Sequence, residues 1–136
     1  MSDEKILPAG EAENREIHAG LRRYNRRFCP NVADLSCCIK DGEGRCIAGT
    51  DSFRMGELVA VDVLWVDEGH RGQGLGAAVL AHVEAQARAQ GARRVELNTF
   101  GFQAPGFYEK QGYRRFGAIE PAVGEHGHYF YVKDLT

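Results

Sequence analysis

The sequence has no apolar stretch that approaches the roughly 20 residues needed to cross a lipid bilayer. Its first residues, MSDEK, lack the basic segment followed by an apolar segment that marks a secretory signal. The chain also has no excess of basic residues, since 17 Lys and Arg face 19 Asp and Glu, for a net charge of −2. This balance excludes the broad positive field with which nucleic-acid-binding proteins hold phosphates. We therefore expect a cytoplasmic protein with neither a membrane nor a nucleic acid as partner.

Cysteine is scarce as well, with Cys29, Cys37, Cys38 and Cys46 as the whole set. No C-x-x-C pair is present, and Cys37 and Cys38 lie within an apolar run. This pattern favours reduced cysteines that fill the core of a cytoplasmic protein over a disulfide framework or a metal site.

What the chain does have is enough length, 136 residues, and enough apolar residues, 43%, for one domain, which we place at residues 1–136. Apolar spacings of three and four predict helices over 11–28 and 75–90, and a shorter helix is expected over 105–111. Extended runs predict strands at 6–7, 35–40, 45–53, 57–66, 94–99, 113–119 and 129–133, the last two flanking a loop with Pro121, Gly124 and Gly127. The order of these elements predicts an α/β domain.

A glycine-rich loop, Arg71-Gly72-Gln73-Gly74-Leu75-Gly76, joins the apolar strand over 57–66 to the second helix. The first turn of a helix has unpaired N–H groups and about half a positive charge. Glycines let such a backbone close around phosphate oxygens, and Arg71 adds a fixed positive charge. The loop therefore predicts a phosphate site, with a tight turn and a solvated arginine as the alternative.

Two familiar phosphate motifs fit this loop poorly. A P-loop requires Lys and then Ser or Thr after its last glycine, whereas this loop continues as Ala77-Ala78. The dinucleotide fingerprint matches in Gly72-x-Gly74-x-x-Ala77, with Glu96 near the expected acidic position. That fingerprint belongs on a first strand, and here several predicted strands precede it, so its position argues against it.

The same loop resembles the R/Q-x-x-G-x-G/A signature of the GNAT N-acetyltransferase superfamily. Leu64-Trp65-Val66 resembles the strand end that precedes this signature, and the segment 107–113, FYEKQGY, resembles a further family segment. The longer run over 98–108 resembles a bacterial subgroup of the superfamily. The resemblance implies a mixed, mostly antiparallel sheet with splayed middle strands and helices on both faces. It also implies acetyl-CoA as cofactor, an amine as acceptor, and a homodimer.

The resemblance assigns roles to particular groups. Backbone groups of Leu64, Trp65 and Val66 would bind the pantetheine arm and polarise the thioester carbonyl, while N–H groups of residues 71–76 would hold the pyrophosphate. On the first predicted helix, Tyr24, Asn25 and Phe28 would help to wall the acceptor pocket, with plain core packing as the alternative for the two aromatic residues.

Tyr108 is the candidate general acid in this resemblance. A phenol, with an ordinary pKa of about 10, can donate a hydrogen bond or a proton to a leaving thiolate with a pKa of about 8.5. The alternative is a half-buried aromatic residue whose hydroxyl is already hydrogen-bonded within the protein.

Asp62 is the candidate general base, because a carboxylate within an apolar central strand requires a reason. Strand alternation places it on the same side as Leu64 and Val66 if no bulge intervenes. It could instead hold a cationic substrate or pair with an arginine of the first helix. Glu57 and Glu96 are weaker candidates.

Among the histidines, His126 and His128 form an H-x-H pair near the last strands, where His126 is a candidate for contact with the acceptor or a plain surface residue. No third ligand has a suitable spacing, so we predict no metal site. The sequence thus predicts acetyl transfer to a primary amine by direct attack in a ternary complex. A non-catalytic acyl-CoA-binding module is the alternative, and the acceptor stays open among small amines, antibiotics, amino acids and protein amines.

Overall fold

The computed structural model describes residues 4–135, which form two compact units divided between Val32 and Ala33. The first unit contains α1 (Glu11–Asn25). Glu11 and Glu13 lie in its first turn, where negative charge favours a helix start, and Gly10 N–H donates to Glu13 Oε1 at 2.9 Å. The helix ends three residues before the predicted Phe28, in a turn. Residues 6–7, predicted as a strand, have no regular structure, because two apolar residues before Pro8 are too few to define one.

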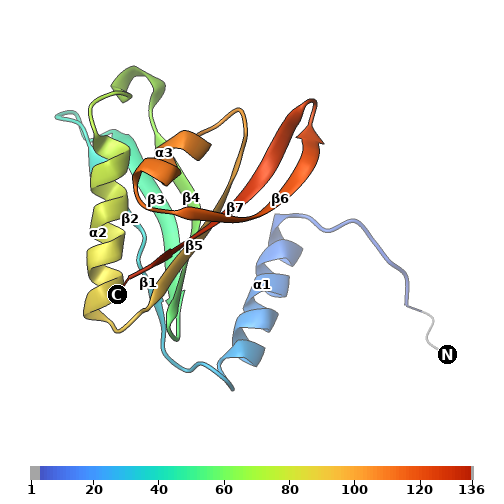
Figure 1. Cartoon of the computed structure of the whole chain (residues 1–136). Coiled ribbons are helices and arrows are strands. Elements are labelled where there is room, and N and C mark those ends of the chain that lie inside the picture. Colours follow the sequence, from blue (N-terminus) through green and yellow to red (C-terminus); the bar gives the residue numbers. More distant parts are fainter. Residues whose placement is uncertain (1–3, 136) are drawn as a thin grey trace. The chain divides into compact units, whose positions relative to one another are not determined.

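The strands form one mixed sheet (Figure 1). Their order is β1-β3-β4-β5-β7-β6, and β2 also pairs with β3. Pairing is parallel between β4 and β5 and antiparallel for β2–β3, β3–β4, β5–β7 and β6–β7. The strands are β1 (Val32–Asp34), β2 (Cys37–Lys40), β3 (Cys46–Met55), β4 (Leu58–Val66), β5 (Arg94–Phe100), β6 (Arg114–Val123) and β7 (His126–Asp134).

The core of the second unit lies between this sheet and α2 (Leu75–Ala89), which contacts β2, β3 and β4. Val79, Leu80, Val83 and Ala87 are its buried apolar face, as the predicted helical spacing required. The short α3 (Pro105–Lys110) adds Tyr108 to the same core. The prediction of helices on both faces of the sheet requires α1 on the second face. Because α1 belongs to the first unit, this arrangement stays a prediction, and so does the single domain over residues 1–136.

A buried polar network ties α2 to the end of α3 and to β7. Glu84 is 6% exposed and accepts hydrogen bonds from Tyr113 Oη at 2.9 Å and from Lys133 Nζ at 2.8 Å. Lys133 Nζ also donates to the carbonyl of Gln111, just after α3, at 2.9 Å. Because each buried charge has a partner, the network fixes α3 against the sheet without an unpaired charge.

Some details differ from the sequence predictions. The last hairpin is longer than predicted, since β6 runs to Val123 and the turn falls at Gly124, with φ +56°. Pro121 is tolerated because β6 is an edge strand, where a missing N–H leaves no ladder partner unsatisfied. All four cysteines are free thiols, but Cys38 and Cys46 are exposed, so the expectation that they fill the core is wrong. Within residues 4–135 no helix has the length and apolar character to traverse a membrane.

Candidate active site

A cleft opens where the two parallel strands diverge. β4 and β5 pair from Leu58 with Arg94 to Val61 with Leu97, and beyond these residues they separate. The space between them has a volume of about 940 Å³. Its walls come from residues 62–66 of β4, the loop and first turn of α2, and the stretch from Asn98 to Tyr108. The predicted splay of the middle strands is therefore present, and it positions most of the predicted site residues around one cleft.

The glycine loop forms one end of this cleft. Gly72 and Gly74 have φ values of +80° and +78°, which glycine adopts without strain, and a Cβ built on either would meet nothing within 4 Å. Residues 71–74 are exposed. Among the described residues, the N–H groups of positions 72–77 have no protein acceptor. Arg71 Nε donates to the carbonyl of Val66 at 3.3 Å, which keeps the guanidinium beside the strand end. The loop thus offers unpaired donors at a helix start to an anion.

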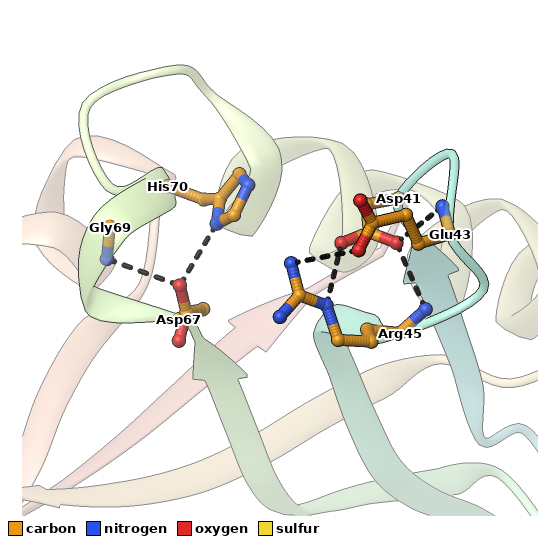
Figure 2. Close-up of polar contacts among 6 residues, drawn as sticks. All are labelled: Asp41, Glu43, Arg45, Asp67, Gly69 and His70. Atoms are coloured by element: carbon orange, nitrogen blue, oxygen red, sulfur yellow. Dashed lines mark hydrogen bonds and ion pairs between the residues drawn. The ribbon is translucent and has the colours of Figure 1, made fainter.

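Two carboxylates brace the segments beside the loop (Figure 2). Asp67 Oδ2 accepts from Gly69 N–H at 3.2 Å and from His70 Nδ1 at 2.9 Å, so it holds the single turn Glu68–His70. The hydrogen bond from His70 is the main reason that the pKa of Asp67 is lowered. In the neighbouring β2–β3 turn, Asp41 accepts from the Arg45 backbone at 3.0 Å and from its Nε at 3.2 Å. The contact with Asp67 fixes His70, which lines the cleft.

A β-bulge interrupts β4 at Asp62. Asp51 pairs with Val63 and Ser52 pairs with Val61, so Asp62 is the extra residue. The condition for placing Asp62 beside Leu64 and Val66, that no bulge intervenes, is therefore not met, and Val61 shares their face instead. The pattern within β4 could not reveal the bulge, since the bulge depends on the register with β3.

The bulge nevertheless leaves Asp62 in the lining of the cleft. Partial burial raises the pKa of its carboxyl, and the nearby Asp51 raises it further. Ser36 Oγ, in turn, donates to Asp51 Oδ1 at 3.3 Å. Although Asp62 is exposed, its raised pKa makes the carboxylate a stronger proton acceptor than one with the ordinary pKa. Its alternative partner, an arginine of α1, belongs to the first unit and stays a prediction.

Tyr108 is a buried residue that contributes to the lining of the cleft. Its side chain is 6% exposed, and its ring packs against Tyr113 and Tyr131 at centroid distances of 6.0 and 6.2 Å. Burial raises the pKa of its phenol to about 12. Its hydroxyl has no hydrogen-bond partner among the described residues, yet it is not sealed from solvent. The alternative of a hydroxyl already hydrogen-bonded within the protein therefore does not apply to the described part of the chain.

The predicted acceptor residues are divided between the two units. In the first unit, Tyr24 packs against Phe28 at 5.5 Å, and their contact with an acceptor, like that of Asn25, stays a prediction. In the second unit, the ring of His126 meets Phe102 edge-on at 5.5 Å, and Phe102 lines the cleft. No group of three metal-ligating side chains occurs within residues 4–135.

Sequence reasoning missed part of the cleft wall, namely Asn98, Phe100 and Phe102. A usable signal was present in the strand pattern. Val95, Leu97 and Thr99 alternate with them and are buried in the core, so Asn98 and Phe100 had to face the other side of the sheet.

The chain matches known proteins over most of its length. The family model described as the acetyltransferase (GNAT) family matches residues 8–113. A blasticidin-S acetyltransferase of Streptomyces morookaense is 46% identical over 138 positions, which cover 95% of this chain and 98% of that protein. An acetyltransferase structure from Bacillus cereus is 30% identical, with a TM-score of 0.78 and coverage of 96% and 97% of the two chains. A solved structure from Agrobacterium tumefaciens is 25% identical, with a TM-score of 0.84 and coverage of 98% and 99%. These matches confirm the fold predicted from the sequence.

Proposed function

The chain belongs to the GNAT family of acetyltransferases and is an N-acetyltransferase, and from that premise we propose that it moves the acetyl group of acetyl-CoA to a small-molecule primary amine by direct attack in a ternary complex. The observation that carries the proposal is the cleft beside the diverging ends of β4 and β5, whose lining includes both the glycine loop with its unpaired helix-start N–H groups and Tyr108. We also propose that the protein is a homodimer in the cytoplasm, and this part of the proposal rests on the family resemblance alone.

The residues present fit acetyl-CoA. The N–H groups of the loop 71–76 would hold the pyrophosphate, because they lack protein acceptors and lie at a helix start. Beyond Val61, β4 no longer pairs with β5, so backbone groups of Leu64, Trp65 and Val66 would be available to the pantetheine amides and to the thioester carbonyl. When bound, acetyl-CoA supplies the acetyl thioester that the amine attacks.

Tyr108 would donate a hydrogen bond from Oη to the departing sulfur. With a pKa of about 12, the phenol stays protonated at every physiological pH. Full proton transfer to a thiolate of pKa about 8.5 would be uphill by about 5 kcal/mol, so hydrogen-bond donation is the role that its chemistry favours. Burial in a cleft strengthens such a bond, because water does not compete for the donor.

Asp62 would accept the proton that the amine must lose. An alkyl amine with a pKa near 10.4 is neutral in only about one molecule in 2,500 at pH 7, so most bound acceptor cannot attack without a base. Asp62 lines the same cleft, and its raised pKa suits proton acceptance, directly or through water.

A change at Asp51 tests this role through pH dependence. The Asp51 charge raises the pKa of Asp62, so Asp51→Asn lowers that pKa. A base works when deprotonated, and therefore the acid limb of the kcat/KM–pH profile is expected to move to lower pH in Asp51→Asn. Asp134→Asn, which changes an exposed acid paired with Arg94, serves as control and should leave the limb in place. An unmoved limb in Asp51→Asn would remove Asp62 from the base role.

The acceptor is proposed by analogy with the blasticidin-S acetyltransferase relative. The test follows thiol release from acetyl-CoA with a panel of amines that includes blasticidin S, polyamines, amino acids and a lysine peptide. Turnover that is fastest with a small molecule is expected. No thiol release with any amine, or a clear preference for the peptide, would contradict the proposal.

A further inference from the structure

Three rings form a parallel stack at the end of β5. Phe102 stacks on Phe100 with a centroid distance of 5.5 Å and an angle of 10° between planes, and Phe100 stacks on His128 at 4.3 Å and 19°. We call Phe102, Phe100 and His128 the aromatic stack. His128 is held in turn by a hydrogen bond of 3.1 Å between its Nε2 and Asn98 Oδ1. The planes are therefore fixed by neighbours on two strands.

The backbone that presents the stack is locked by a side chain and by close packing. Gln103 Oε1 accepts from Phe100 N–H at 2.7 Å, and Gln103 N–H donates to the Phe100 carbonyl at 2.9 Å, which closes the turn that carries Phe102. Gly101 N–H donates to the carbonyl of Gly127 at 2.9 Å. A Cβ on Gly101 would meet the Tyr129 ring at 3.4 Å and Gly127 N at 3.5 Å, so the two segments lie in close contact. The stack is thus preorganised before any ligand arrives.

Phe102 is the most exposed ring of the aromatic stack. Packing in the protein core does not account for a phenylalanine at such an exposed position. Its side chain is 54% exposed, and its ring neighbours among the described residues are Phe100, which stacks on it, and His126, which it meets edge-on at 5.5 Å. Both phenylalanines line the cleft that also holds Asp62 and Tyr108. An exposed aromatic ring at the wall of a cleft, held in a fixed plane, is a surface on which another planar ring can stack.

We propose that the acceptor amine carries a planar conjugated ring that stacks on Phe102, while its amino group lies in the cleft that holds Asp62 and Tyr108. This inference rests on the proposed function and narrows its acceptor to aromatic or heteroaromatic amines. Stacking of a planar ring on an aromatic side chain stabilises a complex by roughly 1–3 kcal/mol in other recognition sites. A patch that only buries apolar surface does not require aromatic rings held in parallel planes.

The test compares two ligands that differ only in the ring, 2-phenylethylamine and 2-cyclohexylethylamine. Binding of each to the protein saturated with coenzyme A is measured by isothermal titration calorimetry, which requires no turnover. The planar amine is expected to bind at least about fivefold more tightly, because about 1 kcal/mol, the low end of this stacking energy, corresponds to about a fivefold change in affinity. A merely apolar surface would favour the saturated ring, which has more apolar area to bury. Equal binding, tighter binding of the saturated amine, or no binding of either amine overturns the inference.

Two variants test whether Phe102 is the residue that causes the preference for the planar amine. Phe102→Leu keeps an apolar side chain without a ring face and is expected to abolish the preference for the planar amine. Phe116→Leu removes an equally exposed ring (56% exposed) that packs on Phe130 and does not line the cleft, so the preference should persist. A preference unchanged in Phe102→Leu, or lost equally in Phe116→Leu, also overturns the inference. Thiol release with the amine panel reports separately on acetyl transfer, so the failure of either proposal can be recognised.

Discussion

Replacement of Gly74 by aspartate is expected to weaken acetyl-CoA binding at least about 100-fold, since like charges brought together at a binding surface cost several kcal/mol. Gly74 is the N-cap of α2, and a Cβ at this position points into open space where the loop meets the cleft. A carboxylate there would cancel the positive end of the helix and repel a bound pyrophosphate. Calorimetric titration with acetyl-CoA measures the loss.

Two controls separate this repulsion from backbone strain. Gly74→Asn has the same shape without the charge and should lose much less affinity than Gly74→Asp. Gly56→Asp places the same residue at φ +58° in the turn between β3 and β4, away from the cleft, and should bind acetyl-CoA normally. Wild-type affinity in Gly74→Asp would show that the pyrophosphate does not lie at this helix start.

The second large effect is expected at Tyr108. Tyr108→Phe keeps the buried ring and its packing but removes the one hydroxyl that we assign to the departing sulfur. We expect kcat to fall at least about tenfold, near the low end of what a positioned proton donor contributes. Affinity for acetyl-CoA should be unchanged, because the loop 71–76 is untouched. Steady-state kinetics together with calorimetry resolves the two effects.

Tyr113→Phe is the matched control for this experiment. Tyr113 is buried beside Tyr108, but its hydroxyl donates to Glu84 and its side chain does not line the cleft. Because this hydrogen bond goes to a buried carboxylate, its loss should lower the free energy of unfolding by about 1.5–3 kcal/mol and leave kcat near the wild-type value. Because the pKa of Tyr108 is about 12, the wild-type enzyme should also show no basic limb from this residue below about pH 11. An unchanged kcat in Tyr108→Phe, or an equal fall in Tyr113→Phe, would remove Tyr108 from the mechanism.

The predictions from sequence succeeded where the signal is local. The loop 71–76 is encoded by glycines between an apolar strand and an amphipathic helix, and α2 begins at Leu75 as predicted. The phosphate site at this loop, like the role of Tyr108, is untested and stays a prediction that needs only neighbouring residues. The short helix that carries Tyr108 is confirmed, and it starts at Pro105.

Non-local features escaped the sequence. The bulge at Asp62 arises from the register between β3 and β4, which alternation within one strand cannot reveal. The stack of Phe102, Phe100 and His128 joins residues that are up to 28 positions apart and depends on β5 pairing with β7. The predicted end of β6 at residue 119 falls short of Val123, because Pro121 indicates a loop in the sequence, whereas an edge strand accepts it.

The most direct test of the central claim follows the backbone amides by two-dimensional NMR as acetyl-CoA is added. The amide resonances of Gly72, Gly74 and Gly76 are expected to shift strongly at saturation, while Gly124, in the hairpin turn outside the cleft, keeps its position. Saturable binding without a shift at these three glycines, or no binding at all, would contradict the placement of the cofactor at the start of α2.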